Sequence, residues 1–206
     1  GKWAIFGDFT RQAIYQNTAR VDNIIEKLED RTSFIRFKLK INCRNTKFIG
    51  DEIKCITGFD SAAYIWSKGE GAPVEHRIFN SPEEQKQQLE ELLNRLIASG
   101  ISAENITILS PYKRENSIIS EVSGIKIKDY TPRIDNAVSF STIQAYKGLE
   151  NTVIIMTDVE SFKHEQLMYV GLSRARSGLF ILESNNARKE YLNIQKRRFL
   201  EDGYKA

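Results

Sequence analysis

Two arginines stand inside an otherwise apolar stretch near the C-terminal end of the chain. Residues 169–176 read Tyr-Val-Gly-Leu-Ser-Arg-Ala-Arg, and a strand-forming run follows at 179–182. The arginine guanidinium is charged at every working pH, and its planar fork of donors matches phosphate oxygens. An arginine at a helix end beside a sheet is therefore placed to reach a phosphate supplied from outside. The same cations could instead offset the dipole of a helix C-terminus.

A second polar segment interrupts two apolar runs. Residues 139–150 read Ser-Phe-Ser-Thr-Ile-Gln-Ala-Tyr-Lys-Gly-Leu-Glu, and Val-Ile-Ile-Met follows at 153–156. A strand that ends in a polar loop and then resumes as a buried apolar strand is typical of the ligand-facing crossovers of α/β sheets. This pattern favours a ligand site at the loop.

Two further polar motifs lie closer to the N-terminus. Residues 3–8 form an apolar run that ends in Gly-Asp, and Gln-Ala-Ile-Tyr follows at 12–15. The segment 39–45 reads Leu-Lys-Ile-Asn-Cys-Arg-Asn. The chain therefore carries four polar loop motifs in a fixed order, each at the end of an apolar run.

This order of motifs resembles the C-terminal half of superfamily 1 helicases of the UvrD, Rep and PcrA kind. The stretch 7–15 is similar to helicase motif III, 42–44 to motif IV, 142–150 to motif V and 169–176 to motif VI. Motifs V and VI are the most specific of the four, and the resemblance spans nearly the whole chain. It implies a RecA-like domain of the P-loop NTPase type, the second of the two motor domains of such a helicase.

The resemblance also implies catalytic roles for three residues. Arg174 matches the arginine finger of motif VI, and Arg44 matches a second arginine that contacts the γ-phosphate. Gln12 matches the glutamine of motif III that senses the γ-phosphate. For Arg44 the residues alone leave a second interpretation open, that of a solvated cation at the end of a strand.

Further residues match the family's ligand contacts. Glu150 is similar to the motif V acid near the ribose, and Gly148 and Asp8 stand in the nucleotide-binding motifs. Thr142 and Gln144 would contact the phosphates of a nucleic-acid strand. Two alternatives stay open: Glu150 as an acid at the start of a helix, and polar side chains that merely satisfy loop backbone groups.

The chain departs from the family pattern in several places. Cys43 stands where relatives usually carry a tyrosine that stacks on adenine, and a thiol offers no large π face. Motif III has one extra residue, which could place Arg11 or Thr10 where Gln12 is expected. Asn17 replaces a tryptophan that stacks on single-stranded DNA, and Gln144 replaces the commoner histidine.

Two elements of a complete nucleotide site are missing from this sequence. It has no Gly-x-x-x-x-Gly-Lys-Ser/Thr loop (Walker A) to cradle phosphates, and no Asp-Glu pair closing a strand to hold magnesium. We therefore expect a fragment of a longer protein, in which ATP with Mg²⁺ is bound mainly by a missing N-terminal motor domain. Residues 1–15 would be the last strand and motif III of that preceding domain, and the isolated chain would be inactive.

The predicted function is that of a second motor domain in an ATP-dependent DNA helicase or translocase acting on single-stranded or forked DNA. Between Arg44 and Thr142 there is no room for the large domain that UvrD-like enzymes insert there, so a compact motor is expected. The alternatives are a related ATPase without strand separation, either nuclease-fused or RNA-directed, and a noncatalytic α/β interaction module.

Composition fits a soluble domain and excludes several classes. Of 206 residues, 41% are hydrophobic and 28% charged, and the net charge of +3 permits nucleic-acid contact without demanding it. Cys43 and Cys55 lie far in sequence from His76 and His164, so neither a metal cluster nor a disulfide framework is indicated. No apolar run approaches the roughly 20 residues of a membrane span. We expect a cytoplasmic protein that does not bind membranes.

Periodicity and punctuation predict alternating strands and helices, which indicates a mostly parallel sheet with helices on both faces. Helix 82–99 is the clearest, because Ser81 can cap it, Pro82 suits its first position and Gly100 ends it. The other expected helices cover about 20–30, 46–57, 114–122, 165–172 and 187–200, and the expected strands cover 3–6, 34–41, 74–79, 105–109, 138–140, 153–156 and 179–182.

Overall fold

The structure is a computed structural model, and it describes residues 41–59, 63–64, 69–133 and 135–203 together with Lys27 and Asp30. For residues 201–203 only the backbone is described. The predicted strand 3–6, nearly all of helix 20–30 and almost all of strand 34–41 therefore lie outside the described residues. So do Asp8 and Gln12, the two predicted site residues of motif III.

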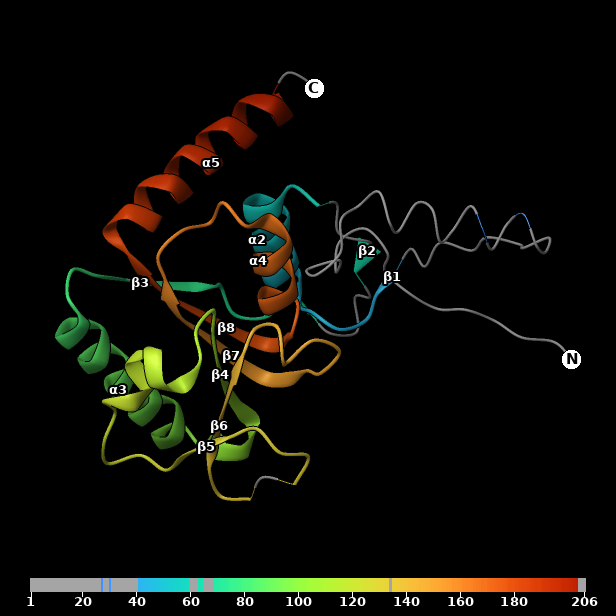
Figure 1. Ribbon diagram of the computed structural model, residues 1–206. Helices are drawn as coiled ribbons and strands as arrows, with labels where there is room; N and C mark the ends of the chain where they lie inside the picture. The colour runs from blue at the N-terminus through green and yellow to red at the C-terminus, as the bar shows by residue number, and fades with distance from the viewer. Residues whose placement is uncertain are drawn as a thin grey trace, which may run out of the picture.

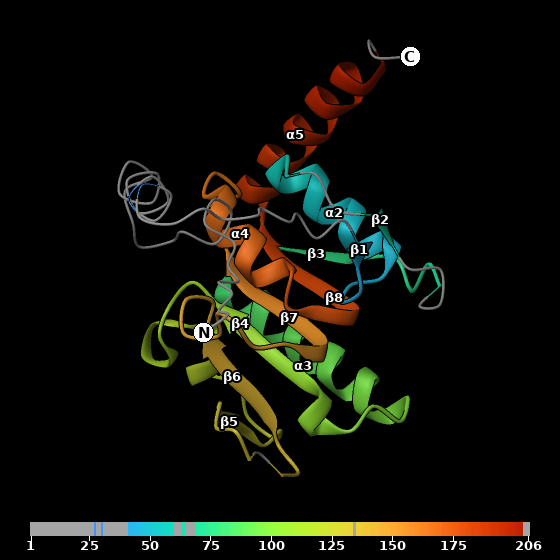
Figure 2. The ribbon, with the colours of Figure 1, turned by 90° about the vertical axis from the view of Figure 1, so that its right-hand side faces the viewer.

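The centre of the molecule is a six-stranded sheet in which every neighbouring pair of strands is parallel. The carboxyl ends of all six strands consequently lie at one edge of the sheet and the amino ends at the other (Figure 2). This arrangement confirms the predicted α/β class. In sheet order the strands are β3 (Glu75–Phe79), β8 (Ala175–Ser184), β7 (Asn151–Val159), β4 (Ile106–Ser110), β6 (Val138–Thr142) and β5 (Ile127–Asp129). A separate two-stranded pair joins β1 (Ile41–Asn42) to β2 (Ala63–Tyr64).

Helices cover both faces of the sheet (Figure 1). On one face α2 (Lys47–Thr57) packs beside α4 (Glu165–Leu172), and α5 (Asn185–Gly203) contacts α2 and extends beyond the sheet. On the other face lies α3 (Pro82–Ala98). This layered arrangement is the expected RecA-like one, with the central strands shielded from water on both sides.

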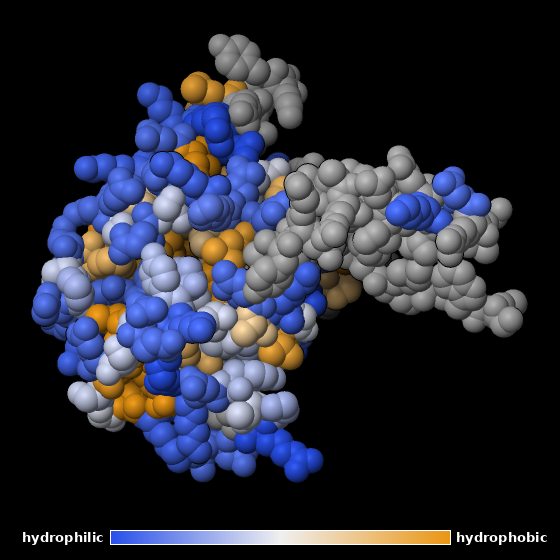
Figure 3. Space-filling view, viewed as in Figure 1, coloured by the Kyte–Doolittle hydropathy of each residue, from blue (hydrophilic) through white to orange (hydrophobic). Residues whose placement is uncertain are grey.

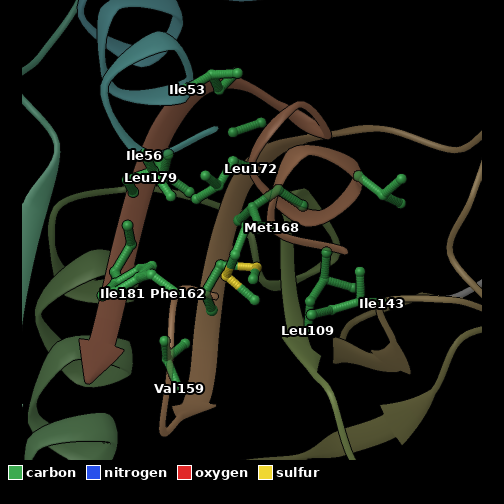
Figure 4. Packing of buried hydrophobic residues seen from close by; sticks show 14 of the residues in the cluster. Ile53, Ile56, Leu109, Ile143, Val159, Phe162, Met168, Leu172, Leu179 and Ile181 are labelled. Atoms are coloured by element: carbon green, nitrogen blue, oxygen red, sulfur yellow. The ribbon is translucent and has the colours of Figure 1, made fainter. Parts of the chain in front are cut away.

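The central strands are apolar on both sides because alternate residues enter different cores. On β7, Ile154 and Met156 face the core under α2 and α4, whereas Val153 and Ile155 face the core under α3. Figure 4 shows the first core, where Met168 and Leu172 of α4 and Ile53 and Ile56 of α2 meet Leu179 and Ile181 of β8.

Local signals explain where two predicted helices begin and end. Ser81 Oγ accepts a hydrogen bond from Glu84 N at 3.2 Å, and Pro82 is the first residue of α3. Helix α2 ends at Gly58, whose φ of 69° is left-handed and whose N–H donates to Lys54 O at 2.8 Å. Both are standard helix-end devices, and they confirm these two predictions within a residue or two.

The predicted helix over 114–122 is wrong. This segment forms two 3₁₀ turns, Arg114–Asn116 and Ile118–Ser120, separated by Ser117 in an extended conformation. The cause is Asp158, a buried residue with φ of 57°, whose carboxylate accepts bonds from Ser117 Oγ at 2.5 Å and Ile118 N at 3.2 Å. Because these donors serve a distant carboxylate, the segment does not continue as a helix.

Strand lengths also differ from the prediction. Strands β7 and β8 both begin earlier than expected, and β8 starts at Ala175, so Arg176 belongs to a strand and not to a helix end. The short edge strand β5 was not predicted. Within the described residues, no helix is long and apolar enough to cross a bilayer. Figure 3 shows one face of the molecule, largely hydrophilic with small apolar patches.

Candidate functional site

The amino ends of β7 and β8 bring together motifs that are distant in sequence. Arg174 lies between α4 and β8, and Glu150 directly precedes β7. Asn151 of β7 pairs with Ala175 of β8, and Asn151 N donates to Arg174 O at 3.2 Å. The ladder between the two strands therefore fixes the backbones of motifs V and VI side by side. Because Glu150 precedes a strand, its interpretation as an acid at a helix start is wrong.

Arg44 joins the same edge from the loop before α2. Its Nε lies 2.6 Å from Glu150 Oε2, and Arg176 Nε lies 3.7 Å from Glu150 Oε1. The structure therefore brings together three sequence-predicted site residues, Arg44, Glu150 and Arg174. Arg176 is a fourth member that the sequence interpretation left without a role.

Arg174 is the most buried member of this group, with 1% of its surface exposed. Its Nε donates to Val170 O at 2.9 Å, Nη1 to Leu149 O at 3.2 Å and Nη2 to Ser173 Oγ at 2.8 Å. Burial and the nearby positive charge of Arg44 lower the pKa of Arg174 to about 10. The group remains protonated at neutral pH, so a cation sits in the fold among neutral acceptors.

Two asparagines beside Arg44 hold this arrangement. Asn45 is buried, and its Nδ2 donates to Ser173 O at 3.3 Å and to Ala175 O at 2.5 Å, the carbonyls on either side of Arg174. Asn42 Oδ1 accepts from the N–H groups of Arg44 at 3.0 Å and Asn45 at 3.2 Å, an Asx turn that shapes the loop. The positions of Arg44 and Arg174 are therefore linked through one amide side chain.

Replacing Asn45 with alanine is expected to lower the free energy of unfolding by about 1–3 kcal/mol, because the carbonyls of Ser173 and Ala175 lose a buried donor. Urea denaturation measures the difference. Asn94→Ala, on the exposed face of α3, is the matched control and should change little. Equal midpoints for both variants would contradict the anchoring role of Asn45.

The predicted nucleic-acid residues lie at the opposite edge of the sheet. Thr142 is the last residue of β6, at the carboxyl ends of the strands, and Gln144 follows it. Thr142 Oγ1 accepts from Ala145 N at 3.2 Å, so this hydroxyl also satisfies the backbone of its own loop. The structure therefore does not place Thr142 and Gln144 beside the arginines.

The segment 143–150 connects the two edges. It leaves the carboxyl end of β6 and reaches the amino end of β7, because both strands run parallel to β4. Tyr146 anchors its middle, being 1% exposed with its hydroxyl 3.2 Å from Thr107 Oγ1. Gly148 has a φ of 89°, a left-handed conformation that glycine adopts without strain, and it turns the chain toward Glu150.

A comparison with known protein families shows which family the chain belongs to. A family model described as an AAA domain matches residues 7–186. The chain belongs to this AAA domain family. A search of curated proteins found no match.

Solved structures resemble this AAA domain in fold. The C-terminal domain of a possible DNA helicase from Lactobacillus plantarum WCFS1 is 16% identical with a TM-score of 0.55, and the match covers 74% of this chain and 96% of that one. A PRRSV helicase structure is also 16% identical, with a TM-score of 0.39, and the match covers 76% of this chain and 25% of that one. The first match confirms the predicted RecA-like α/β fold.

The side chains of the AAA domain at this edge suit phosphate better than metal. One carboxylate, Glu150, pairs with two guanidinium groups, those of Arg44 and Arg176, and the guanidinium of Arg174 lies nearby. The cluster therefore carries excess positive charge, and guanidinium donors match phosphate oxygens. Among the residues that the structure describes, no group of three or more His, Cys, Asp or Glu side chains could hold a metal ion. The donor set therefore fits the phosphate part of a nucleotide better than a metal ion.

Sequence reasoning missed two members of the site in this AAA domain. Asn45 has no local signal, because its partners lie at 173 and 175 and only the fold brings them close. Arg176 lies in the stretch 169–176, but the sequence placed it at the end of a helix and gave it no role. Its place at the start of β8 turns it toward Glu150. Cys43, next to Arg44, is exposed and offers no aromatic face.

Proposed function

We propose that this AAA domain is the second motor domain of an ATP-dependent superfamily 1 DNA helicase or translocase. The observation that carries the proposal is the convergence of Arg44 and Arg174, from motifs far apart in sequence, beside Glu150 at the amino ends of β7 and β8. A cationic cluster with one carboxylate suits the terminal phosphates of a nucleotide held by another domain.

Each residue then has a defined task. Arg174 and Arg44 stabilise the negative charge that develops on the γ-phosphoryl group, and Gln12 senses that group. Glu150, Gly148 and Asp8 approach the rest of the nucleotide. ATP supplies the phosphoryl group, and a separate RecA-like domain holds Mg²⁺ and the phosphate cradle, in keeping with the lack of a Walker A loop in this sequence. Hydrolysis is fast only when both domains close on the nucleotide.

The second task of the domain is to bind single-stranded or forked DNA. Thr142 and Gln144 contact strand phosphates at the carboxyl edge, on the same segment that ends at Glu150. Segment 143–150 joins the two edges as one continuous stretch of chain, packed into the core through Tyr146. This connection would couple nucleotide state to the hold on DNA.

The test is ATP turnover by a polypeptide that carries this domain together with a phosphate-cradling motor domain, with and without single-stranded DNA. We expect turnover that rises with DNA and separation of the strands of a forked duplex. Turnover that responds to RNA but not to DNA, or occurs without strand separation, would favour a related ATPase that does not unwind DNA. No turnover under any of these conditions would reject the motor function and leave an interaction module.

A further inference from the structure

Glu150 is shared by two arginines that come from different parts of the chain. Arg44 approaches Oε2 at 2.6 Å and Arg176 approaches Oε1 at 3.7 Å. The side chains of Glu150, Arg44 and Arg176 are 42%, 38% and 51% exposed. Ion pairs this exposed are individually weak, because water and salt screen them. An anion from solution can therefore compete for both arginines.

The backbone around Glu150 is held much more firmly than its side chain. Leu149 O accepts from the buried Arg174, and Asn151 N donates to the carbonyl of the same arginine. The backbone of Glu150 is thus fixed beside Arg174, whereas its carboxylate lies on a side chain that is 42% exposed. The side chain can turn aside while the backbone stays in place.

We propose that Glu150 is an internal counter-ion that occupies Arg44 and Arg176 until the polyphosphate of a nucleotide displaces it. The inference rests on the proposed function and adds a regulatory step to the same site. It also makes Arg176 a third phosphate-binding arginine. In this exchange the two exposed arginines, Arg44 and Arg176, change partner.

Charge explains why such an exchange is favourable in one direction. Arg44 lies close enough to Arg174 for their like charges to repel, and Glu150 compensates part of this repulsion in the protein without nucleotide. A polyphosphate carries several negative charges and more acceptor oxygens than one carboxylate, so it satisfies both arginines better. The carboxylate thereby keeps the arginines in place for the phosphate but lowers the affinity for it.

The experiment is a titration of the chain with inorganic tripolyphosphate, followed through the Nε–H NMR signals of Arg44 and Arg176. Glu150→Gln should bind tripolyphosphate about three- to tenfold more tightly than the unmodified chain, because the competing charge is gone. Asp129→Asn is the matched control, since it also removes one carboxylate paired with an arginine, Arg114, at 2.7 Å. Asp129 ends β5, at the opposite edge of the sheet, so this variant should bind as the unmodified chain does.

A second titration with ATP separates the counter-ion role from ribose recognition. If Glu150→Gln weakens ATP binding and leaves tripolyphosphate binding unchanged, Glu150 serves the ribose and the counter-ion proposal is wrong. If Glu150→Gln and Asp129→Asn tighten tripolyphosphate binding equally, the change in net charge explains the effect. This result would also overturn the counter-ion proposal. If neither ligand shifts the signals of Arg44 and Arg176 in any variant, the proposed phosphate site itself fails.

Discussion

Replacing Arg174 with lysine should lower ATP turnover about a thousandfold or more in a polypeptide that carries both motor domains, while the affinity for nucleotide changes little. A cation that stabilises charge only in the transition state contributes to turnover and not to ground-state binding. Lysine keeps the charge but lacks the planar fork of donors that matches phosphate oxygens. Steady-state kinetics with a separate measurement of nucleotide affinity gives both quantities.

Arg176→Lys is the control for Arg174→Lys, because both residues flank the start of β8 and differ mainly in burial. Arg174 is 1% exposed and Arg176 has a half-exposed side chain. We expect Arg176→Lys to lower turnover about tenfold at most, since the ammonium group of an exposed lysine can still reach the phosphate. If Arg176→Lys abolished turnover and Arg174→Lys did not, the arginine finger would be Arg176.

Loss of structure must be separated from loss of chemistry in the Arg174 variant. The guanidinium bonds to Val170, Leu149 and Ser173 join α4 to the start of β7, so Arg174→Lys also removes structural contacts. Thermal unfolding of the chain measures that part. A folded Arg174→Lys variant with normal nucleotide affinity and no turnover supports the catalytic role of Arg174. If Arg174→Lys unfolds, the turnover of Arg176→Lys shows whether Arg176 is the arginine finger.

The sequence predicted the elements whose signals are local. Helix α3 carries its cap at Ser81 and a proline at its first position, and Gly58 ends α2, so a few adjacent residues suffice to place them. The strands β4, β7 and β8 were predicted because both of their faces are buried, which makes their central residues apolar. The order of the motifs then predicted that these elements form a RecA-like domain.

The elements that were missed depend on contacts between distant residues. The turns around Ser117 follow from the carboxylate of Asp158, which lies on another strand and is also bonded by Ser110 Oγ at 2.6 Å. Strand β5 has one neighbour and only three residues, so its sequence carries almost no periodicity. Neither feature can be derived from a window of adjacent residues.

The candidate site divides in the same way. Arg44, Glu150 and Arg174 were predicted through their motifs, and the fold brings them together at one edge. Asn45 was missed because an asparagine after an arginine is no signal of a structural role in the sequence. Its role follows only from its two carbonyl partners, which are distant in sequence. Gln12 and Asp8 remain predictions, since they lie outside the described residues.

The second large effect is expected at a buried charge cluster near the carboxyl end of β8. His76 of β3 lies between two carboxylates: its Nδ1 is 3.1 Å from Glu183 Oε1 of β8, and its Nε2 is 3.2 Å from Glu52 Oε1 of α2. Tyr191 of α5 donates to Glu52 Oε2 at 3.2 Å. The cluster therefore joins four elements, β3, β8, α2 and α5, at the end of β8 opposite Arg174.

The protonation of His76 sets a pH dependence of stability. Burial disfavours the imidazolium and is the largest single influence, but the hydrogen bonds and charges of Glu183 and Glu52 together outweigh it and raise the pKa of His76 to about 9. Because the pKa in the folded state exceeds the ordinary value of 6.5, the stabilisation is complete below about pH 6.5 and is lost as the pH rises through 9. We expect the free energy of unfolding to fall by on the order of 3 kcal/mol over this range.

Replacing Glu183 with glutamine should reduce this pH dependence, because Glu52 alone then raises the pKa of His76, and should destabilise the chain at pH 6.5 by about 3 kcal/mol. The Glu183 side chain is fully buried, so a neutral amide there leaves the imidazolium with one carboxylate partner fewer in a medium of low dielectric constant. Urea denaturation at pH 6.5 and pH 9.5 measures both effects. Glu75→Gln on β3 is the control, because Glu75 bonds two arginines, Arg77 and Arg95, and not a histidine. A pH slope that persists in Glu183→Gln and disappears in Glu75→Gln would show that His76 is not its source.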